Sequence, residues 1–173
     1  MWLKFAGVIF VIAACAGLGM EAALRFKRRL RLLEKLKLMI THLKGEILYA
    51  NVPLAEAFER TGARNPGRAG TLFQAVAARL SEETGERFAL IWKEQAGTFV
   101  KDSELSHRER EQLLSFGEHL GYLDREMQEK TLLLYLEDLE YSVRVIRKEE
   151  PEKCRLYMSL GLMSGLFLAV VLV

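Results

Sequence analysis

The chain has 173 residues, of which 50% are hydrophobic and 28% are charged, and its formal net charge is +2 at pH 7. So small a charge excludes a polycation that binds nucleic acid along its whole length. Two cysteines fit a reducing cytoplasm and are too few to hold a metal ion by themselves.

The first predicted element is an apolar run from Phe5 to Met20, which spans a bilayer once residues 2, 3 and 22–24 are included. We therefore expect residues 1–24 to form an N-terminal transmembrane helix. The segment 12–15, Ile-Ala-Ala-Cys, resembles a lipobox, so the alternative is an exported lipoprotein that is cleaved before Cys15 and has a binding or scaffold role. Against that alternative, the apolar run continues to Met20 and a dense cationic block follows it.

Basic residues flank both apolar ends of the chain, since a second apolar run extends from Leu156 to Val173. Such residues stay on the cytoplasmic side of a membrane, so both flanks predict the same compartment for the middle of the chain. We expect a cytoplasmic helical domain at residues 25–153 and a C-terminal transmembrane helix at residues 154–173, in which Gly161 and Gly165 allow close helix packing. The membrane-flanking basic residues are Arg25, Lys27, Arg28, Arg29, Arg31, Lys153 and Arg155.

Two apolar seams with heptad-like spacing lie next to the predicted spans. One helix leaves the membrane and the other returns to it, so the spacing predicts a long antiparallel helix pair. The first seam is Leu33, Leu36, Ile40, Leu43 and Ile47, and the second is Leu132, Leu136, Leu139, Val143 and Ile146.

Shorter helices are predicted between the two seams, and no stretch alternates as a strand does, so the fold class is an all-α helical bundle. The expected helices are Pro53–Thr61 ending at Gly62, a helix from Leu72 to near Gly85, a helix carrying Phe88, Ile91, Trp92 and Phe99, and a helix that begins with a Ser106–Glu109 capping box and closes at Gly121. We expect a loop at residues 62–70, a cap at Asp124 for the last long helix, and an interruption of that helix near the membrane at Pro151, with a kink there.

The sequence offers little catalytic chemistry. It contains no phosphate-binding loop, no His-Glu-x-x-His zinc motif and no Cys-x-x-Cys pair. His42, His107 and His119 are scattered and are expected to be surface or packing residues. We therefore expect a protein that is not an enzyme, with no metal, no cofactor, no small-molecule substrate and no nucleic-acid partner.

Several segments together resemble the stage III sporulation protein AB family. They are Trp2-Leu3-Lys4-Phe5-Ala6-Gly7-Val8, Leu43 to Tyr49 followed by Pro53-Leu54-Ala55, Leu72-Phe73, Phe116 to Gly121 followed by Asp124 and Gln128, and the tail from Ser159-Leu160-Gly161 onward. The resemblance covers essentially the whole chain in order.

This resemblance implies a structural role in endospore formation, within the multiprotein complex that links the mother cell to the engulfed forespore. The helical domain would be similar to the inner-membrane platform domains of type II secretion systems. By that analogy it would be an assembly platform for a secretion-type ATPase and would contact membrane subunits of the complex. The implied location is the mother-cell membrane around the forespore.

The motif residues are expected to meet at the membrane-distal tip of the helix pair. One interpretation is a docking surface for the ATPase. The other is a corner built for packing, in which Gly117 and Gly121 allow close approach, Asp124 caps a helix, and Tyr49 and Phe116 form local core. The residues concerned are Glu46, Tyr49, Pro53, Phe116, Gly117, Glu118, Gly121 and Asp124.

Overall fold

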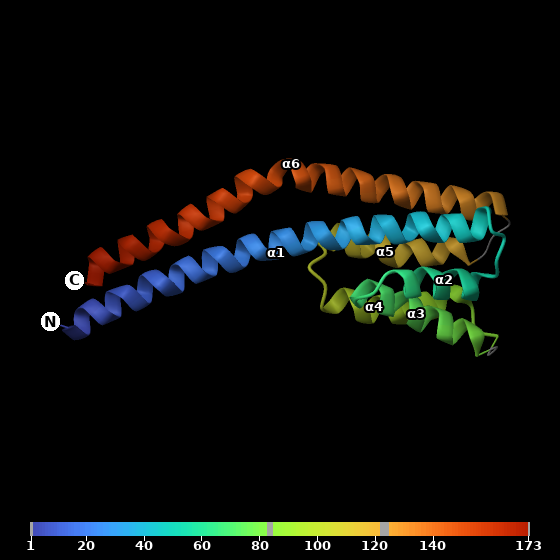
Figure 1. The fold of residues 1–173 in the computed structure, drawn as a ribbon, viewed down its shortest axis with the longest axis horizontal. Helices are drawn as coiled ribbons and strands as arrows, with labels where there is room; N and C mark the ends of the chain where they lie inside the picture. Colours follow the sequence, from blue (N-terminus) through green and yellow to red (C-terminus); the bar gives the residue numbers. More distant parts are fainter. Residues whose placement is uncertain (1, 83–84, 122–124, 173) are drawn as a thin grey trace. The chain divides into compact units, whose positions relative to one another are not determined.

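A computed structural model describes residues 2–82, 85–121 and 125–172, and it is all-α, as predicted (Figure 1). The described residues contain no strand. Their helices are α1 (Trp2–Leu48), α2 (Leu54–Arg64), α3 (Arg68–Ser81), α4 (Phe88–Lys101), α5 (His107–Leu120) and α6 (Arg125–Leu172).

The chain divides into two compact units, and α1 and α6 contribute to both. Unit 1 comprises Met1–Leu30 and Arg144–Val173, and unit 2 comprises Arg31–Val143. The predicted domain limits at residues 24/25 and 153/154 fall inside α1 and α6, and they stay predictions.

In each unit the segments of α1 and α6 run antiparallel, because residues later in α1 contact residues earlier in α6. In unit 1, Lys27 pairs with Glu150 at 3.7 Å, and the Cys154 thiol lies 3.8 Å from the carbonyl oxygen of Ala23. In unit 2, Lys37 pairs with Glu140 at 3.6 Å, and the Arg125 guanidinium donates to the carbonyl oxygen of Leu48.

The first predicted seam is confirmed, since its five side chains are all buried on α1. The second seam differs at one position: Tyr135 is buried and Leu136 is only partly so. A stripe at residues 132, 135 and 139 fits the 3.6-residue helical period as well as a stripe at residues 132, 136 and 139 does. Periodicity alone therefore does not decide which of residues 135 and 136 is buried.

Aromatic side chains from five helices fill the interior of unit 2. The Trp92 ring lies 5.8 Å from Phe58 and 5.3 Å from Phe116, measured between centroids. Phe116 stacks on Tyr135 at 4.8 Å and Phe58 contacts Phe73 at 5.0 Å. This cluster joins α2, α3, α4, α5 and α6 into one core.

Two predicted boundaries are wrong. α2 continues through Gly62 to Arg64, and α3 begins at Arg68, so the loop predicted at residues 62–70 shrinks to 65–67. Gly62 does not end the helix; a Cβ there would come within 2.9 Å of the Gly70 carbonyl oxygen, so its small size lets α2 and α3 approach closely. At Pro151, where an interruption with a kink was predicted, α6 continues as one helix from Arg125 to Leu172.

Two other local predictions are confirmed. Ser106 and Glu109 form the predicted capping box, in which the Glu109 carboxylate accepts from the Ser106 amide at 2.8 Å. α5 ends at Leu120 with Gly121 as its cap. The predicted cap Asp124 lies outside the described residues.

The terminal helices were predicted to span a membrane. Over the residues that the structure describes, no helix combines the length and the apolar character that a membrane span requires. The two transmembrane helices are therefore not confirmed.

Candidate docking surface

The ends of α1 and α6 meet in unit 2, where the motif residues were predicted to come together. α1 ends as the amides of Tyr49 and Ala50 both donate to the Gly45 carbonyl oxygen, at 3.0 and 3.1 Å. Asn51 then adopts a positive φ of 53°, a conformation that asparagine tolerates better than most residues. The Arg125 guanidinium closes the corner on the Leu48 carbonyl oxygen.

Glu46 lies inside this corner and is not an open docking residue. Its side chain is 8% exposed, and its carboxylate accepts from Arg60 at 3.2 Å and from Arg64 at 2.7 Å. The hydrogen bond to Glu46, with the charge of Glu56 nearby, raises the pKa of Arg60 above its usual value. Glu46 thus ties α1 to α2.

Phe116 and Gly117 also lie in the interior. Phe116 is 3% exposed, between Trp92 and Tyr135. A Cβ on Gly117 would overlap the Trp92 ring. Gly121 lies at the surface, but a Cβ there would come within 2.7 Å of Phe88, so this glycine also serves packing.

Besides Gly121, the exposed members of the predicted set are Tyr49, Pro53 and Glu118. The Tyr49 side chain is 79% exposed, although we expected local core at this position if the corner served packing. Pro53 caps the start of α2, and Glu118 lies on the outer face of α5. Asp124 lies outside the described residues. The side chains exposed at this tip are therefore one tyrosine, one proline and one glutamate.

The sequence patterns did not identify three residues that are structurally important in this region. Arg60 and Arg64 hold Glu46, and their i, i+4 spacing on one face of α2 is the signal that could have suggested a shared partner. Tyr135 completes the aromatic core, and burial raises its pKa above the ordinary value near 10.

The basic residues near the apolar ends are partly neutralised by neighbouring glutamates. In unit 1, Arg25 and Arg28 share Glu21 at 3.2 and 2.7 Å, and Lys153 pairs with Glu149 at 2.7 Å. Arg31 and Arg155 are exposed, and Arg29 is partly buried. These contacts leave the predicted topology untested.

Gly161 is a point of close backbone approach in unit 1. A Cβ at Gly161 would come within 2.7 Å of the Cys15 carbonyl oxygen and 3.1 Å of the Gly19 Cα. Gly165 is buried. Cys15 and Cys154 are both free thiols.

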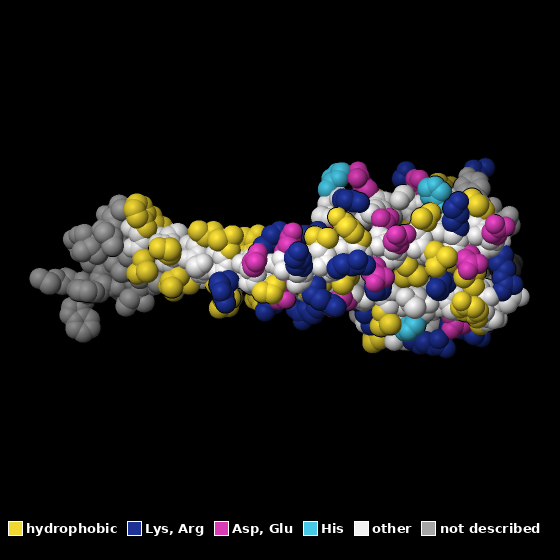
Figure 2. Space-filling model, turned by 90° about the horizontal axis from the view of Figure 1, so that it is seen from above, with side chains coloured by type: hydrophobic (Ala, Val, Ile, Leu, Met, Phe, Trp, Pro, Cys, Tyr) yellow, Lys and Arg dark blue, Asp and Glu magenta, His cyan; other side chains and the backbone are white. Residues whose placement is uncertain are grey.

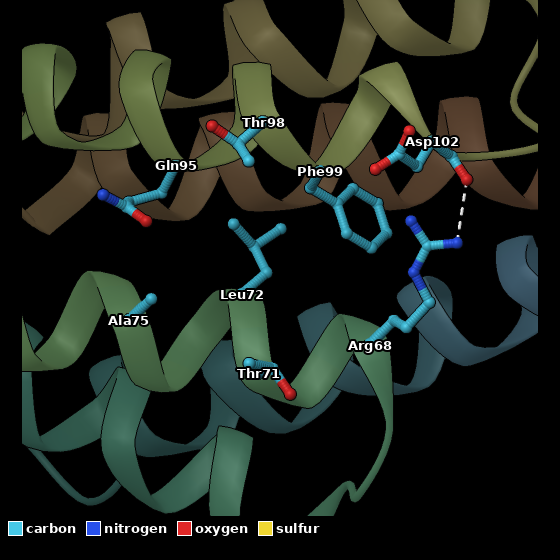
Figure 3. A pocket seen from close by; sticks show the side chains of 8 residues that line it. All are labelled: Arg68, Thr71, Leu72, Ala75, Gln95, Thr98, Phe99 and Asp102. Atoms are coloured by element: carbon cyan, nitrogen blue, oxygen red, sulfur yellow. Dashed lines mark hydrogen bonds between the residues drawn. The ribbon is translucent and has the colours of Figure 1, made fainter.

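A shallow hollow lies between α3 and the end of α4 (Figure 3). Its volume is about 270 Å³, and Leu72 and Phe99 line it beneath a rim of polar side chains. Arg68 reaches across from α3 and donates to the Asp102 carbonyl oxygen at 2.8 Å. This contact joins the two helix ends and offers no pair of groups suited to acid–base chemistry.

The three histidines have separate partners. His42 lies 3.2 Å from the Asn65 side-chain nitrogen, His107 pairs with Glu111 at 3.4 Å, and His119 lies 3.0 Å from the Ser115 carbonyl oxygen. No group of side chains that could hold a metal ion occurs in the described ranges.

Comparisons with known proteins agree on one family. The family model for stage III sporulation protein AB matches residues 4–173. The protein of that name from Bacillus subtilis (strain 168) is 29% identical over 170 residues, covering 98% of this chain and 99% of the relative. A solved structure of stage III sporulation protein AB is similar with a TM-score of 0.66 and 27% identity, over 72% of this chain and 98% of that one.

Proposed function

The chain belongs to the stage III sporulation protein AB family, and on that premise we propose that it is a non-enzymatic, membrane-anchored scaffold of a sporulation complex. The observation that carries the proposal is the match to the family from residue 4 to residue 173, which includes both apolar ends and the helical unit between them. The direct test is deletion of the gene in its host, followed by counts of heat-resistant spores. Normal counts would remove the sporulation role.

Exposed apolar side chains support the membrane anchor. In unit 1, Phe10, Leu18, Met163 and Phe167 are each at least 68% exposed to solvent. Figure 2 shows hydrophobic side chains on the surface of this unit. Large exposed apolar areas mark membrane or protein contacts, and the basic flanks favour the cytoplasmic side for unit 2.

Carbonate extraction of cell membranes tests the anchor. The full chain should stay in the membrane pellet, and so should variants that lack either 1–20 or 156–173. A variant lacking both segments should be released. Reporters fused to each terminus should lie outside the cytoplasm; a cytoplasmic reporter at either end would contradict the proposed topology.

The lipoprotein alternative makes a different prediction about the N-terminus. It requires loss of the first 14 residues and a lipid on Cys15. The structure has Cys15 within the continuous helix α1, rather than at the start of a polar linker. Mass spectrometry of the mature protein separates the two, because the scaffold keeps its N-terminal residues.

The partner proposed for the tip is the secretion-type ATPase of the complex. Tyr49, Pro53 and Glu118 are exposed there, whereas Glu46 supports the corner from inside. Glu118→Lys should therefore reduce spore counts while leaving membrane level and helix content unchanged. The matched control is Glu94→Lys, an exposed glutamate on α4. Normal sporulation of Glu118→Lys and of Tyr49→Ala would make the tip purely structural.

A further inference from the structure

A groove between α5 and α6 in unit 2 has the form of a helix-binding site. Its volume is about 220 Å³, and the stacked rings of Phe116 and Tyr135 form part of its lining. Met127 and Leu134 line it from α6, and Ser115 and His119 line it from α5. The groove is thus apolar toward its base and has polar edges.

α6 carries a second apolar stripe along this groove, in addition to the face that packs in the core. Met127, Leu134 and Tyr141 are 44%, 55% and 56% exposed and follow one another at intervals of seven residues. Two heptads of helix extend over about 21 Å. The Arg108 guanidinium lies 5.9 Å from the centroid of the Tyr141 ring, so α5 accompanies the stripe to that end. A heptad stripe of this kind suits a third helix laid beside the first two.

Carboxylates surround the stripe. Glu111 and Glu118 lie on α5 within one turn of Ser115, and Glu137 lies on α6 within one turn of Leu134, so the helical period puts them at the rim. Glu126 precedes Met127, and Asp138 is in the lining. Two cations, Arg108 and Lys130, lie on the same stretches of the two helices, and the charges of Arg125 and Glu129 cancel, so the local charge is −3 with neutral histidines. The acidic rim around an apolar stripe selects an occupant that is apolar in the middle and basic at its edges.

We propose that this groove binds a basic amphipathic helix of a partner protein. The helix would have about 15 residues or more, apolar side chains at heptad spacing and lysine or arginine beside them, and it would lie along α5 and α6. The inference rests on the proposed scaffold role and adds a second contact surface, which shares Glu118 with the tip. The peptide experiment below does not depend on sporulation, so either proposal can fail alone.

The test uses the full chain in phosphatidylcholine nanodiscs and labelled peptides of about 17 residues, enough to cover the stripe. One peptide has leucine at heptad a and d positions and lysine elsewhere, and the other replaces each lysine with glutamate. Fluorescence anisotropy, corrected with empty nanodiscs, measures the binding. We expect the lysine peptide to bind and the glutamate peptide to bind at least about tenfold more weakly.

Matched variants locate the site. Leu134 and Leu90 are both 55% exposed leucines on helices, and Leu90 lies on α4 away from the groove. Leu134→Gln should weaken binding about tenfold or more, because a leucine contact is lost, whereas Leu90→Gln should not change it. Glu137→Lys should weaken binding of the lysine peptide more at low salt than at high salt, because salt screens the charge repulsion. Circular dichroism checks that each variant is folded.

Three results would overturn the proposal. The first is no binding of the lysine peptide above empty nanodiscs. The second is equal affinity of Leu134→Gln and Leu90→Gln, which would place the peptide elsewhere. The third is self-association of the chain, measured by light scattering, that Leu134→Gln abolishes; the occupant would then be a second copy of this chain.

Discussion

Gly117 of α5 lies directly against the ring of Trp92 on α4, so closely that a Cβ at this position would overlap the ring. Trp92 cannot move aside easily, because it is fully buried and its Nε1–H donates to the Leu113 carbonyl oxygen at 2.8 Å. The pair joins two helices at the centre of the aromatic core.

The Gly117→Ala variant tests this contact. The added methyl group should destabilise unit 2 by about 1–3 kcal/mol or more, as overpacking of a filled core does. Urea unfolding followed by circular dichroism measures the change. The control is Gly97→Ala on α4, where nothing lies within 4 Å of the new Cβ; it should be neutral or stabilising by up to about 1 kcal/mol. Equal stability of the two variants would mean that a methyl group at position 117 fits beside Trp92 without a steric clash.

The pH dependence of stability should reveal the buried Tyr135. Burial raises its pKa in the folded state, so between the unfolded value near 10 and the folded value the unfolded chain alone has lost the proton. Stability from this group is fully present below about pH 10 and falls above it by up to about 1.4 kcal/mol per pH unit. Tyr135→Phe should remove this part of the alkaline slope. Identical slopes for the two proteins between about pH 9 and about pH 11 would contradict the burial of the phenol.

We expect Glu46 to contribute to the stability of the fold and not directly to docking. Glu46→Gln weakens charge-assisted hydrogen bonds to Arg60 and Arg64 and should cost about 1–3 kcal/mol of unfolding free energy. Glu56→Gln removes only an exposed partner of Arg60 and should change stability by less than about 0.5 kcal/mol. Thermal unfolding of both variants decides this. A fully stable Glu46→Gln protein that fails in sporulation would return Glu46 to the docking surface.

Gly161 should control helix packing in unit 1. In a Cys15→Ser background, the Ala23→Cys variant should form a disulfide with Cys154 under mild oxidation, since the Cys154 thiol lies beside the Ala23 carbonyl oxygen. Gly161→Val should lower the yield, because its side chain would meet the backbone of Cys15 and Gly19.

Gly17→Val is the control for this crosslink, because nothing lies within 4 Å of its Cβ. Its disulfide yield should equal that of the parent protein on non-reducing gels. Equal yields from Gly161→Val and Gly17→Val would show that close approach at Gly161 is not required.

Periodicity and capping in the sequence determined the helices, because both depend on neighbours within a few residues. The heptad spacing of Leu33 to Ile47 predicted a buried face of α1, and Ser106 with Glu109 predicted the start of α5. The family resemblance was likewise visible in short segments such as those around Glu46 and Phe116.

Only the tertiary structure decided which residues of these segments contact one another. Gly62, Gly117 and Gly121 are needed where a second helix comes close, and Gly62 was therefore misread as a helix end. Glu46 became an interior ion-pair residue because α2 brings Arg60 and Arg64 to it across 14 and 18 residues of sequence. Burial and pairing are properties of side chains distant in sequence, so no local pattern determines them.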